Sequence, residues 1–165
     1  GHLVLSTLHT NNAAGAIPRF INMGVEPFLI ASSIEAVIAQ RLARRLCDKC
    51  RQPAVLSDAV RTNVVDVLNQ SPVPAVKQRA TTELAFFGPQ GCAECHDGYK
   101  GRIGLYEVMT VSPEIESLTA KKATLGEIQT VAMQQGMVSM KQDGLLKALA
   151  GLTSLDEVFR VTTSE

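Results

Sequence analysis

The segments Cys47-Asp48-Lys49-Cys50 and Cys92-Ala93-Glu94-Cys95 contain all four cysteines of this 165-residue chain. A Cys-x-x-Cys spacing lets two thiolates bind one tetrahedral zinc ion, at Zn–S distances of about 2.3 Å. Turn-forming residues surround the second pair, as a tight metal-binding loop requires: Gly88, Pro89, Gly91, Gly98 and Gly101. The two pairs together predict one structural zinc site formed by Cys47, Cys50, Cys92 and Cys95.

The spacer between the two pairs is long for a single zinc site. Forty-one residues separate Cys50 from Cys92, whereas zinc ribbons usually have about 15–20. Doubling a flexible loop costs only about 0.6 kcal/mol, whereas structural zinc binding contributes roughly 10–16 kcal/mol. The spacer is therefore compatible with one shared ion. A thiol redox domain, disulfides and unlinked thiols are the alternatives that the spacing leaves open.

Composition excludes several classes of protein. Hydrophobic residues make up 45% of the chain, which is enough to bury a core without the help of disulfides. We recognise no signal peptide, and no apolar run approaches the roughly 18 residues of a membrane span. We therefore expect a cytoplasmic protein that does not insert into a membrane and whose thiols stay reduced.

The charge distribution argues against nucleic acid as a partner. Sixteen basic and sixteen acidic residues give a formal net charge of zero, so no bulk field attracts a polyanion. A local basic cluster surrounds the first cysteine pair: Arg41, Arg44, Arg45, Lys49 and Arg51. Nearby cations would offset the net charge of a tetrathiolate zinc site. None of the seven aromatic residues alternates with these arginines as a base-stacking platform would require, although a zinc-ribbon nucleic-acid module stays the alternative.

The first residues predict a buried strand that ends in polar side chains. Residues 1–12 read Gly-His-Leu-Val-Leu-Ser-Thr-Leu-His-Thr-Asn-Asn. A nearly continuous apolar run is typical of a parallel strand that is covered on both faces. Because the run starts two residues from the end and without an initiator methionine, we expect a fragment of a larger α/β protein.

A helix is expected to follow this strand. Asn11 or Asn12 would cap it, Pro18 would kink it and Gly24 would end it. Ligands of open α/β sheets bind where strands end and helices begin, so the polar residues here, His9 above all, form a candidate site. The alternative is a capping network of ordinary polar side chains.

Residues 1–11 resemble the His box of the secretion ATPase superfamily, the P-loop motors of type II secretion and type IV pilus assembly. The resemblance continues through most of the chain, over residues 13–19, 23–29, 39–42, both cysteine pairs, 98–107, 143–148 and 151–158. Its end is similar to that of the pilus-extension members, with the type II secretion members as the alternative. The retraction motors of the superfamily lack the cysteine module.

The resemblance implies an α/β fold, the C-terminal part of a RecA-like P-loop ATPase core with an inserted tetracysteine zinc module and a C-terminal helical subdomain. It divides the chain into core (1–46), zinc insert (47–101), returning core strand (102–111) and helical subdomain (112–165). The family's motors are hexamers that bind ATP and magnesium. Self-association, inner-membrane platform proteins as partners and a peripheral position at the inner membrane are therefore implied.

The resemblance also assigns site residues. His2 and His9 match the two histidines of the His box, which implies a supporting role in catalysis, because a histidine near the γ-phosphate can position water. The alternative for both is a hydrogen-bonded core pair that braces the strand end. Gln40 and Arg41 match the family's Ala-Gln-Arg-Leu element and are implied to brace the site or to lie near the nucleotide.

The phosphate-binding motifs of the family lie upstream of the His box. No Gly-x-x-x-x-Gly-Lys-Ser/Thr occurs in the 165 residues. Phosphoryl transfer requires a phosphate cradle and a bound magnesium ion. We therefore expect the parent protein to hydrolyse ATP and this chain alone to be inactive.

The segment 37–46 is ambiguous by pattern alone. Its apolar residues recur at helical spacing, whereas the family implies a strand paired with residues 102–111, which alternate at period two. We expect the strand pair, with the cysteine pairs just beyond its ends. A helix is predicted over 58–69, and further helices begin after Ser112, after Thr124, near Met137 and after Ser154.

Overall fold

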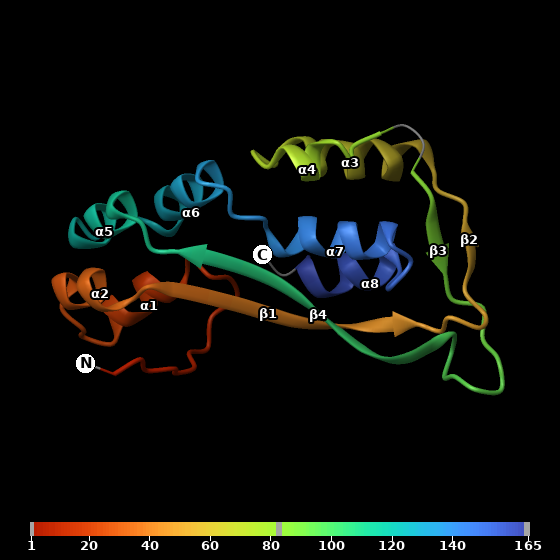
Figure 1. Cartoon of the computed structure of the whole chain (residues 1–165), viewed down its shortest axis with the longest axis horizontal. Helices are drawn as coiled ribbons and strands as arrows, with labels where there is room; N and C mark the ends of the chain where they lie inside the picture. Colours follow the sequence, from red (N-terminus) through yellow and green to blue (C-terminus); the bar gives the residue numbers. More distant parts are fainter. Residues whose placement is uncertain (1, 82–83, 164–165) are drawn as a thin grey trace.

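The computed structural model describes residues 2–81 and 84–163 of the chain. Its longest feature is an antiparallel pair, β1 (Ala36–Leu46) and β4 (Tyr99–Thr110), which runs along most of the molecule (Figure 1). The register pairs Ala36 with Thr110 and Arg44 with Arg102, and an irregularity follows before Leu46 pairs with Tyr99. The strand expected over 37–46 is confirmed, and the helical periodicity of that segment is misleading.

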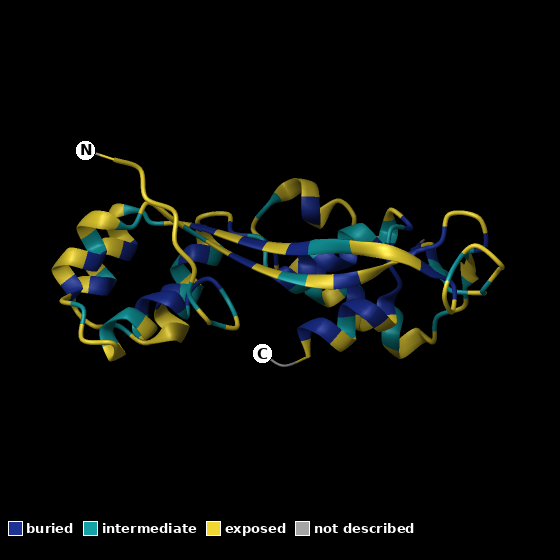
Figure 2. Ribbon diagram, turned by 90° about the horizontal axis from the view of Figure 1, so that it is seen from below, coloured by how far each residue is buried: buried dark blue, intermediate teal, exposed yellow. Residues whose placement is uncertain are grey.

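The two faces of this hairpin differ in burial, which explains the misleading pattern. Leu105 and Met109 are fully buried on the inner face. Apolar side chains also occupy the outer face, where Ile38 is 65% and Leu42 is 48% exposed. Figure 2 shows buried and exposed positions alternating along both strands. Apolar residues on both faces of β1 blur the period of two that would mark a half-buried strand.

Four helices gather at the end of the hairpin where β1 begins and β4 ends (Figure 1). They are α1 (Ala16–Asn22), α2 (Pro27–Ser33), α5 (Pro113–Ala120) and α6 (Leu125–Gln134). The expected caps are present: Ser112 accepts from the Ile115 amide with Pro113 at the first helical position, and Thr124 and Glu127 form a capping box.

The N-terminal segment departs from its prediction. Residues 2–10 form no regular secondary structure, and Leu3, Val4 and Leu5 are 78–90% exposed. A strand needs a hydrogen-bonded neighbour, and no strand of the described residues pairs with this segment. The strand predicted here is therefore not observed.

The boundaries of α1 also differ from those expected. Its N-cap is Gly15 rather than Asn11 or Asn12. The Asn12 side chain accepts a hydrogen bond from the Gly15 amide at 2.9 Å, just before the helix begins. Pro18 lies in the first turn, where its missing N–H has no helical partner to lose, so it costs the helix no hydrogen bond. Gly24, with φ +86°, follows the last turn and ends the helix as predicted.

The segment between β1 and β4 folds over the other end of the hairpin. It contains β2 (Gln52–Ala54) paired antiparallel with β3 (Phe86–Gly88), and α3 (Asp58–Asn69) followed by α4 (Pro74–Lys77). In Figure 1, α3 and α4 lie above α7 (Met140–Leu149), which lies beside α8 (Leu155–Thr162). The helix predicted over 58–69 is confirmed, and α7 starts later than expected, at a capping box of Ser139 and Gln142.

The inserted segment and the C-terminal helices share one hydrophobic core. Val64 and Leu68 of α3 pack in the same buried cluster as Leu145 of α7 and Val158 of α8. A second cluster lies around α1, α2, α5 and α6 and includes Met109 of β4. The insert is therefore a packed part of the C-terminal half of the molecule. No helix of the described residues combines the length and the apolarity that crossing a bilayer requires.

A buried carboxylate joins α8 to β1. The side chain of Glu157 is 1% exposed and accepts from the backbone amide and the guanidinium of Arg44, both at 2.8 Å. The guanidinium of Arg160 donates to both carboxylate oxygens at 2.8 Å. Hydrogen bonds from Arg160, and then from Arg44, outweigh burial and lower the pKa of Glu157 to about 2.

Replacing Glu157 with glutamine should destabilise the chain in a pH-dependent way. Because the folded pKa lies below the ordinary value of 4.5, the stabilisation is present above pH 4.5 and is lost as the pH falls toward about 2. At neutral pH we expect a loss of roughly 2 to 3 kcal/mol, measured by urea denaturation. Asp156→Asn, at an exposed neighbour in α8, is the control and should cost less than about 1 kcal/mol. A loss that does not shrink with acidification would contradict this assignment.

Candidate functional site

Two tight turns bring the cysteine pairs together at the end of the hairpin. Cys47 directly follows β1, and its carbonyl accepts from the amides of Cys50 at 3.3 Å and Arg51 at 3.0 Å. The second pair precedes β4, and the Cys92 carbonyl accepts from the Cys95 amide at 3.3 Å. The amide of Cys47 donates to the Gly98 carbonyl at 2.8 Å, which ties one turn to the other. The sequence placed both pairs just beyond the strand ends, and the structure confirms this.

A two-residue turn positions the second pair against β4. Asp97 and Gly98 have φ values of 51° and 82°, and His96 and Tyr99 exchange backbone hydrogen bonds across them. Positive φ at both central residues is characteristic of a type I′ turn, for which Asp-Gly is a favoured pair. A Cβ at Gly98 would lie 2.4 Å from the Cβ of Pro89, so the turn also needs glycine for close packing.

The four sulfur atoms have the spacing of a tetrahedral metal site. All four lie within 4.8 Å of one another. The Sγ–Sγ distances are 3.9 Å for Cys47–Cys92, 3.6 Å for Cys50–Cys95 and 3.5 Å for Cys92–Cys95. Zn–S bonds of about 2.3 Å in a regular tetrahedron correspond to sulfur separations of about 3.8 Å. These three distances are close to that value, so the four thiols are compatible with one zinc ion.

Burial and hydrogen bonding give the thiols different acidities. Burial raises the pKa of Cys50 to about 12. Burial acts in the same direction at Cys95, but hydrogen bonds from the Cys92 thiol and backbone outweigh it and lower the pKa to about 7. Because a thiolate is the form that binds metal, metal binding at this cluster would release protons from the thiols.

Four of the five residues of the basic cluster beside the first pair contact carboxylates. Arg45 and Arg51 both contact Asp48, Arg44 contacts Glu157 and Lys49 contacts Glu94. The pair Lys49–Glu94 connects the middle of one Cys-x-x-Cys segment to the middle of the other. The sequence suggested that these cations offset the charge of the metal site. The direct partners of Arg44, Arg45, Lys49 and Arg51 are carboxylates, and the offset of the metal-site charge stays a prediction.

The His-box residues lie on an exposed segment. Both His2 and His9 are exposed. The segment is anchored just after His9. Asn11 accepts from the Arg41 guanidinium at 3.3 Å, which connects this segment to β1.

Gln40 and Arg41 are separated by the pleat of β1. The side chain of Gln40 is exposed on the outer face, and Arg41 is partly buried on the inner face. The structure therefore places Arg41 beside the His-box segment through Asn11 and does not place Gln40 with it.

Glu107 is a second anchor of this segment that the sequence analysis missed. It is 1% exposed on the inner face of β4, and its Oε1 accepts from the Ala13 amide at 2.8 Å. Its Oε2 accepts from the Met140 amide at the start of α7 at 3.4 Å. A charged residue at an inward position of an alternating strand was the signal that could have identified it.

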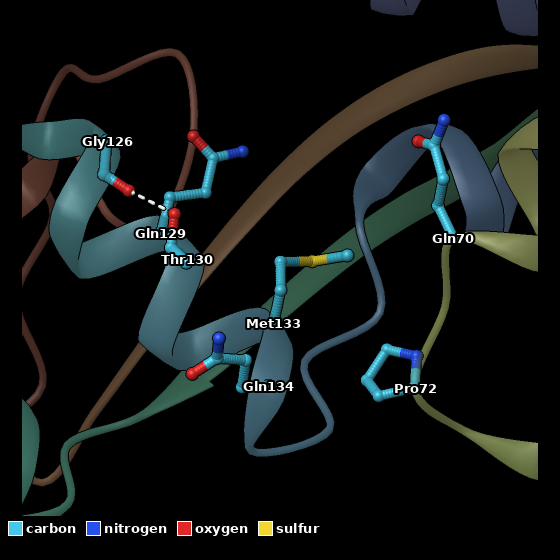
Figure 3. Close-up of a pocket in the computed structure, with 7 residues that line it drawn as sticks. All are labelled: Gln70, Pro72, Gly126, Gln129, Thr130, Met133 and Gln134. Atoms are coloured by element: carbon cyan, nitrogen blue, oxygen red, sulfur yellow. Dashed lines mark hydrogen bonds between the residues drawn. The ribbon is translucent and has the colours of Figure 1, made fainter.

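A shallow hollow elsewhere on the molecule lacks groups suited to catalysis or metal binding. Figure 3 shows it between α6 and the segment after α3, with Gln70 and Pro72 on one side and Gln129 and Thr130 on the other. Its volume is about 460 Å³ and its lining contains no ionisable side chain. The Thr130 hydroxyl donates to the Gly126 carbonyl at 2.7 Å and is already satisfied. The cysteine cluster, not this hollow, is therefore the candidate functional site, because its side chains can bind a metal ion.

Comparison with known proteins places the chain among secretion proteins. The family model described as "Type II/IV secretion system protein" matches residues 1–160. The type IV pilus assembly ATPase PilB of Acinetobacter baylyi is 44% identical over 163 residues, covering 99% of this chain and 27% of the relative. PilB of Myxococcus xanthus is 42% identical over 159 residues, covering 96% and 26%. Type II secretion system protein E of Pseudomonas aeruginosa is 42% identical over 167 residues, covering 100% and 30%. The chain thus spans less than a third of each of these relatives.

Replacing Glu107 with alanine should loosen the attachment of the His-box segment. The amides of Ala13 and Met140 would lose their acceptor in a buried environment, and a buried unsatisfied group costs about 1–3 kcal/mol. We expect a stability loss in that range by thermal or urea denaturation. Glu116→Ala, at an exposed position of α5, is the control and should change stability by no more than about 0.5 kcal/mol. Equal stabilities of the two variants would show that Glu107 anchors nothing.

Proposed function

Because the chain belongs to the type II/IV secretion system protein family, we propose that it is the C-terminal portion of a cytoplasmic ATPase that powers type IV pilus assembly. The observation that carries the proposal is the tetracysteine cluster at the end of the β1–β4 hairpin, in a chain that matches pilus and secretion ATPases along its length. Within this proposal, residues 1–46 and 102–111 belong to a RecA-like core, 47–101 form the zinc insert and 112–165 form a helical subdomain.

We infer that the cluster holds one structural zinc ion through Cys47, Cys50, Cys92 and Cys95. Four thiolates complete a tetrahedral shell and leave no position for water or substrate, so the ion would supply folding free energy and no chemistry. Its place at the end of both strands supports this role, since it closes the loop that separates them.

The ATPase activity would belong to the longer protein. There, His9 and His2 would support hydrolysis by positioning water or a phosphate oxygen, and their exposure leaves them accessible to a ligand. Arg41 and Glu107 would hold the segment that carries them through Asn11 and Ala13. ATP and magnesium would bind mainly to residues outside this chain, and Gln40 would contribute at most from the outer face of β1.

The proposed assembly is a hexamer that works with inner-membrane platform proteins without itself inserting into the membrane. The relatives named type II secretion system protein E match this chain about as well as the pilus ATPases, so secretion is the second candidate. The two are separated by complementation: the longer protein should restore pili to a pilus-assembly mutant and should not restore protein secretion to a type II mutant. The reverse result would assign it to secretion.

A zinc-ribbon nucleic-acid module is the candidate from another class. The arginines and the lysine beside the first cysteine pair would have to contact phosphates, but all except Arg41 are already paired with Asp48, Glu94 or Glu157. This pairing supports an internal structural role for the basic cluster.

The chain should contain one zinc ion when it is purified under reducing conditions. Cys92→Ser should remove the ion and destabilise residues 47–101 together with the helices that share their core, because three thiolates and a hydroxyl make a far weaker site. Ala93→Ser, between the two ligands of the same turn, is the matched control and should retain the metal. The measurement is elemental analysis combined with thermal denaturation. A thiol-reduced wild-type chain with well under one zinc ion would refute the metal assignment.

ATP hydrolysis should be absent from the isolated chain and should depend on the His box in the longer protein. There, His2→Ala and His9→Ala should each lower kcat on the order of 10²-fold, the low end for acid–base assistance. His96→Ala, at a histidine that is exposed and outside the His box, is the control and should leave kcat unchanged. Normal turnover of the first two variants would show that neither histidine contributes to catalysis. Robust hydrolysis by the isolated chain would contradict the proposal that ATP and magnesium bind mainly to residues outside it.

A further inference from the structure

The loop between α7 and α8 lies against the residues that flank the first cysteine pair. The Leu46 amide, directly before Cys47, donates to the Leu152 carbonyl at 3.0 Å. The Arg51 guanidinium, directly after Cys50, donates to the Gly151 carbonyl at 2.5 Å. The loop is therefore held from both ends of the four-residue metal-binding turn.

Two further contacts tie the same loop to the strand ends. The Thr153 hydroxyl, fully buried, donates to the Arg44 carbonyl at 2.8 Å. The hydroxyl of Tyr99, the first residue of β4, lies 2.8 Å from the hydroxyl of Ser154, which caps α8. Both strands that lead to the cysteines thus contact the residues that start α8.

The contact between Arg51 and the loop requires a close approach. Gly151 has φ +71°, and a Cβ there would lie 2.6 Å from the Arg51 guanidinium and 3.0 Å from the Phe87 ring. Arg51 is also placed over that ring, at 5.0 Å from its centroid. The fit therefore depends on where the turn over 47–50 holds Arg51, which lies 100 residues before Gly151 in the chain.

We propose that metal binding at the cysteine cluster and the docking of α8 are coupled, so that zinc stabilises the C-terminal helix as well as the insert. The coupling rests on the zinc site proposed above. Without the ion, the turn over 47–50 keeps its backbone hydrogen bonds but loses the link between the two cysteine pairs, so the positions of Leu46 and Arg51 against the loop are less firmly fixed. Because α8 packs in the same core as α3, its release also weakens the insert. The effect is reciprocal by linkage, and loosening the loop must lower the affinity for zinc by the same factor.

Hydrogen–deuterium exchange of the chain, with and without zinc, tests the coupling. Removing zinc with a chelator should raise exchange in residues 155–162 roughly tenfold, the effect of losing two hydrogen bonds, while α6 exchanges as before. The variant Thr153→Val, studied with zinc bound, removes the hydrogen bond from the loop to the Arg44 carbonyl and so tests the effect of loosening the loop. This variant should raise exchange in α8 and lower the affinity for zinc severalfold in a competition titration with a chromophoric chelator.

Thr119→Val is the matched control, since Thr119 is equally buried and its hydroxyl also donates to a carbonyl at 2.8 Å, within its own helix. It should change neither α8 exchange nor zinc affinity. If zinc-free chain unfolds as a whole, Thr153→Val with zinc bound decides the question. If zinc binds normally, and neither its removal nor Thr153→Val changes exchange in α8, the coupling is wrong and the metal site stands. A chain that binds no zinc would overturn the metal site and the coupling with it.

Discussion

A two-stranded antiparallel hairpin is marginally stable in water by itself, and the pair β1–β4 is interrupted at its closed end by the whole segment between Leu46 and Tyr99. Bringing the two strands together across such a loop has an entropic cost that a short turn would avoid. The four thiols converge where this cost arises, at the ends of both strands. A zinc ion bound there, as proposed above, would fix the register of the hairpin at one end. The helices α1, α2, α5 and α6 pack around the other end.

The edges of the hairpin are covered by the C-terminal helices. On β4, the Tyr106 amide donates to Asp143 at 2.8 Å and the Gly104 carbonyl accepts from Lys147 at 2.7 Å. On β1, Glu157 accepts from the Arg44 amide at 2.8 Å. Unpaired strand edges are sites of unwanted association, and these side chains occupy part of both edges. The C-terminal helices therefore protect the same strands that the cysteine cluster joins.

Much of the fold could be predicted from local signals. The caps at Ser112 and Thr124 and the helix over 58–69 follow from side-chain and backbone preferences that act within a few residues, so the sequence predicts them well. The strand over 37–46 could not be predicted from periodicity, because apolar side chains on its outer face imitate a helix. Its assignment came from resemblance to a family.

The candidate site likewise has parts that local sequence predicts and parts that only the fold brings together. The cysteine cluster was predictable because its spacing and its chemistry are both encoded in two short segments. Glu107 and Glu157 were not predicted as anchors, since their partners, Ala13 and Arg44, are about a hundred residues away and only the fold brings them together. The prediction of an N-terminal strand was wrong for a related reason. Its apolar composition was clear, but a strand is completed by a neighbour, and no strand of the described residues pairs with it.

The most direct test of this account is X-ray absorption at the zinc K-edge on the reduced, folded chain. The account predicts four sulfur neighbours at about 2.3 Å and no lighter ligand in the first shell. A shell that contains nitrogen or oxygen, or fewer than four sulfur atoms, would contradict the claim that one ion joins the ends of β1 and β4 through all four cysteines.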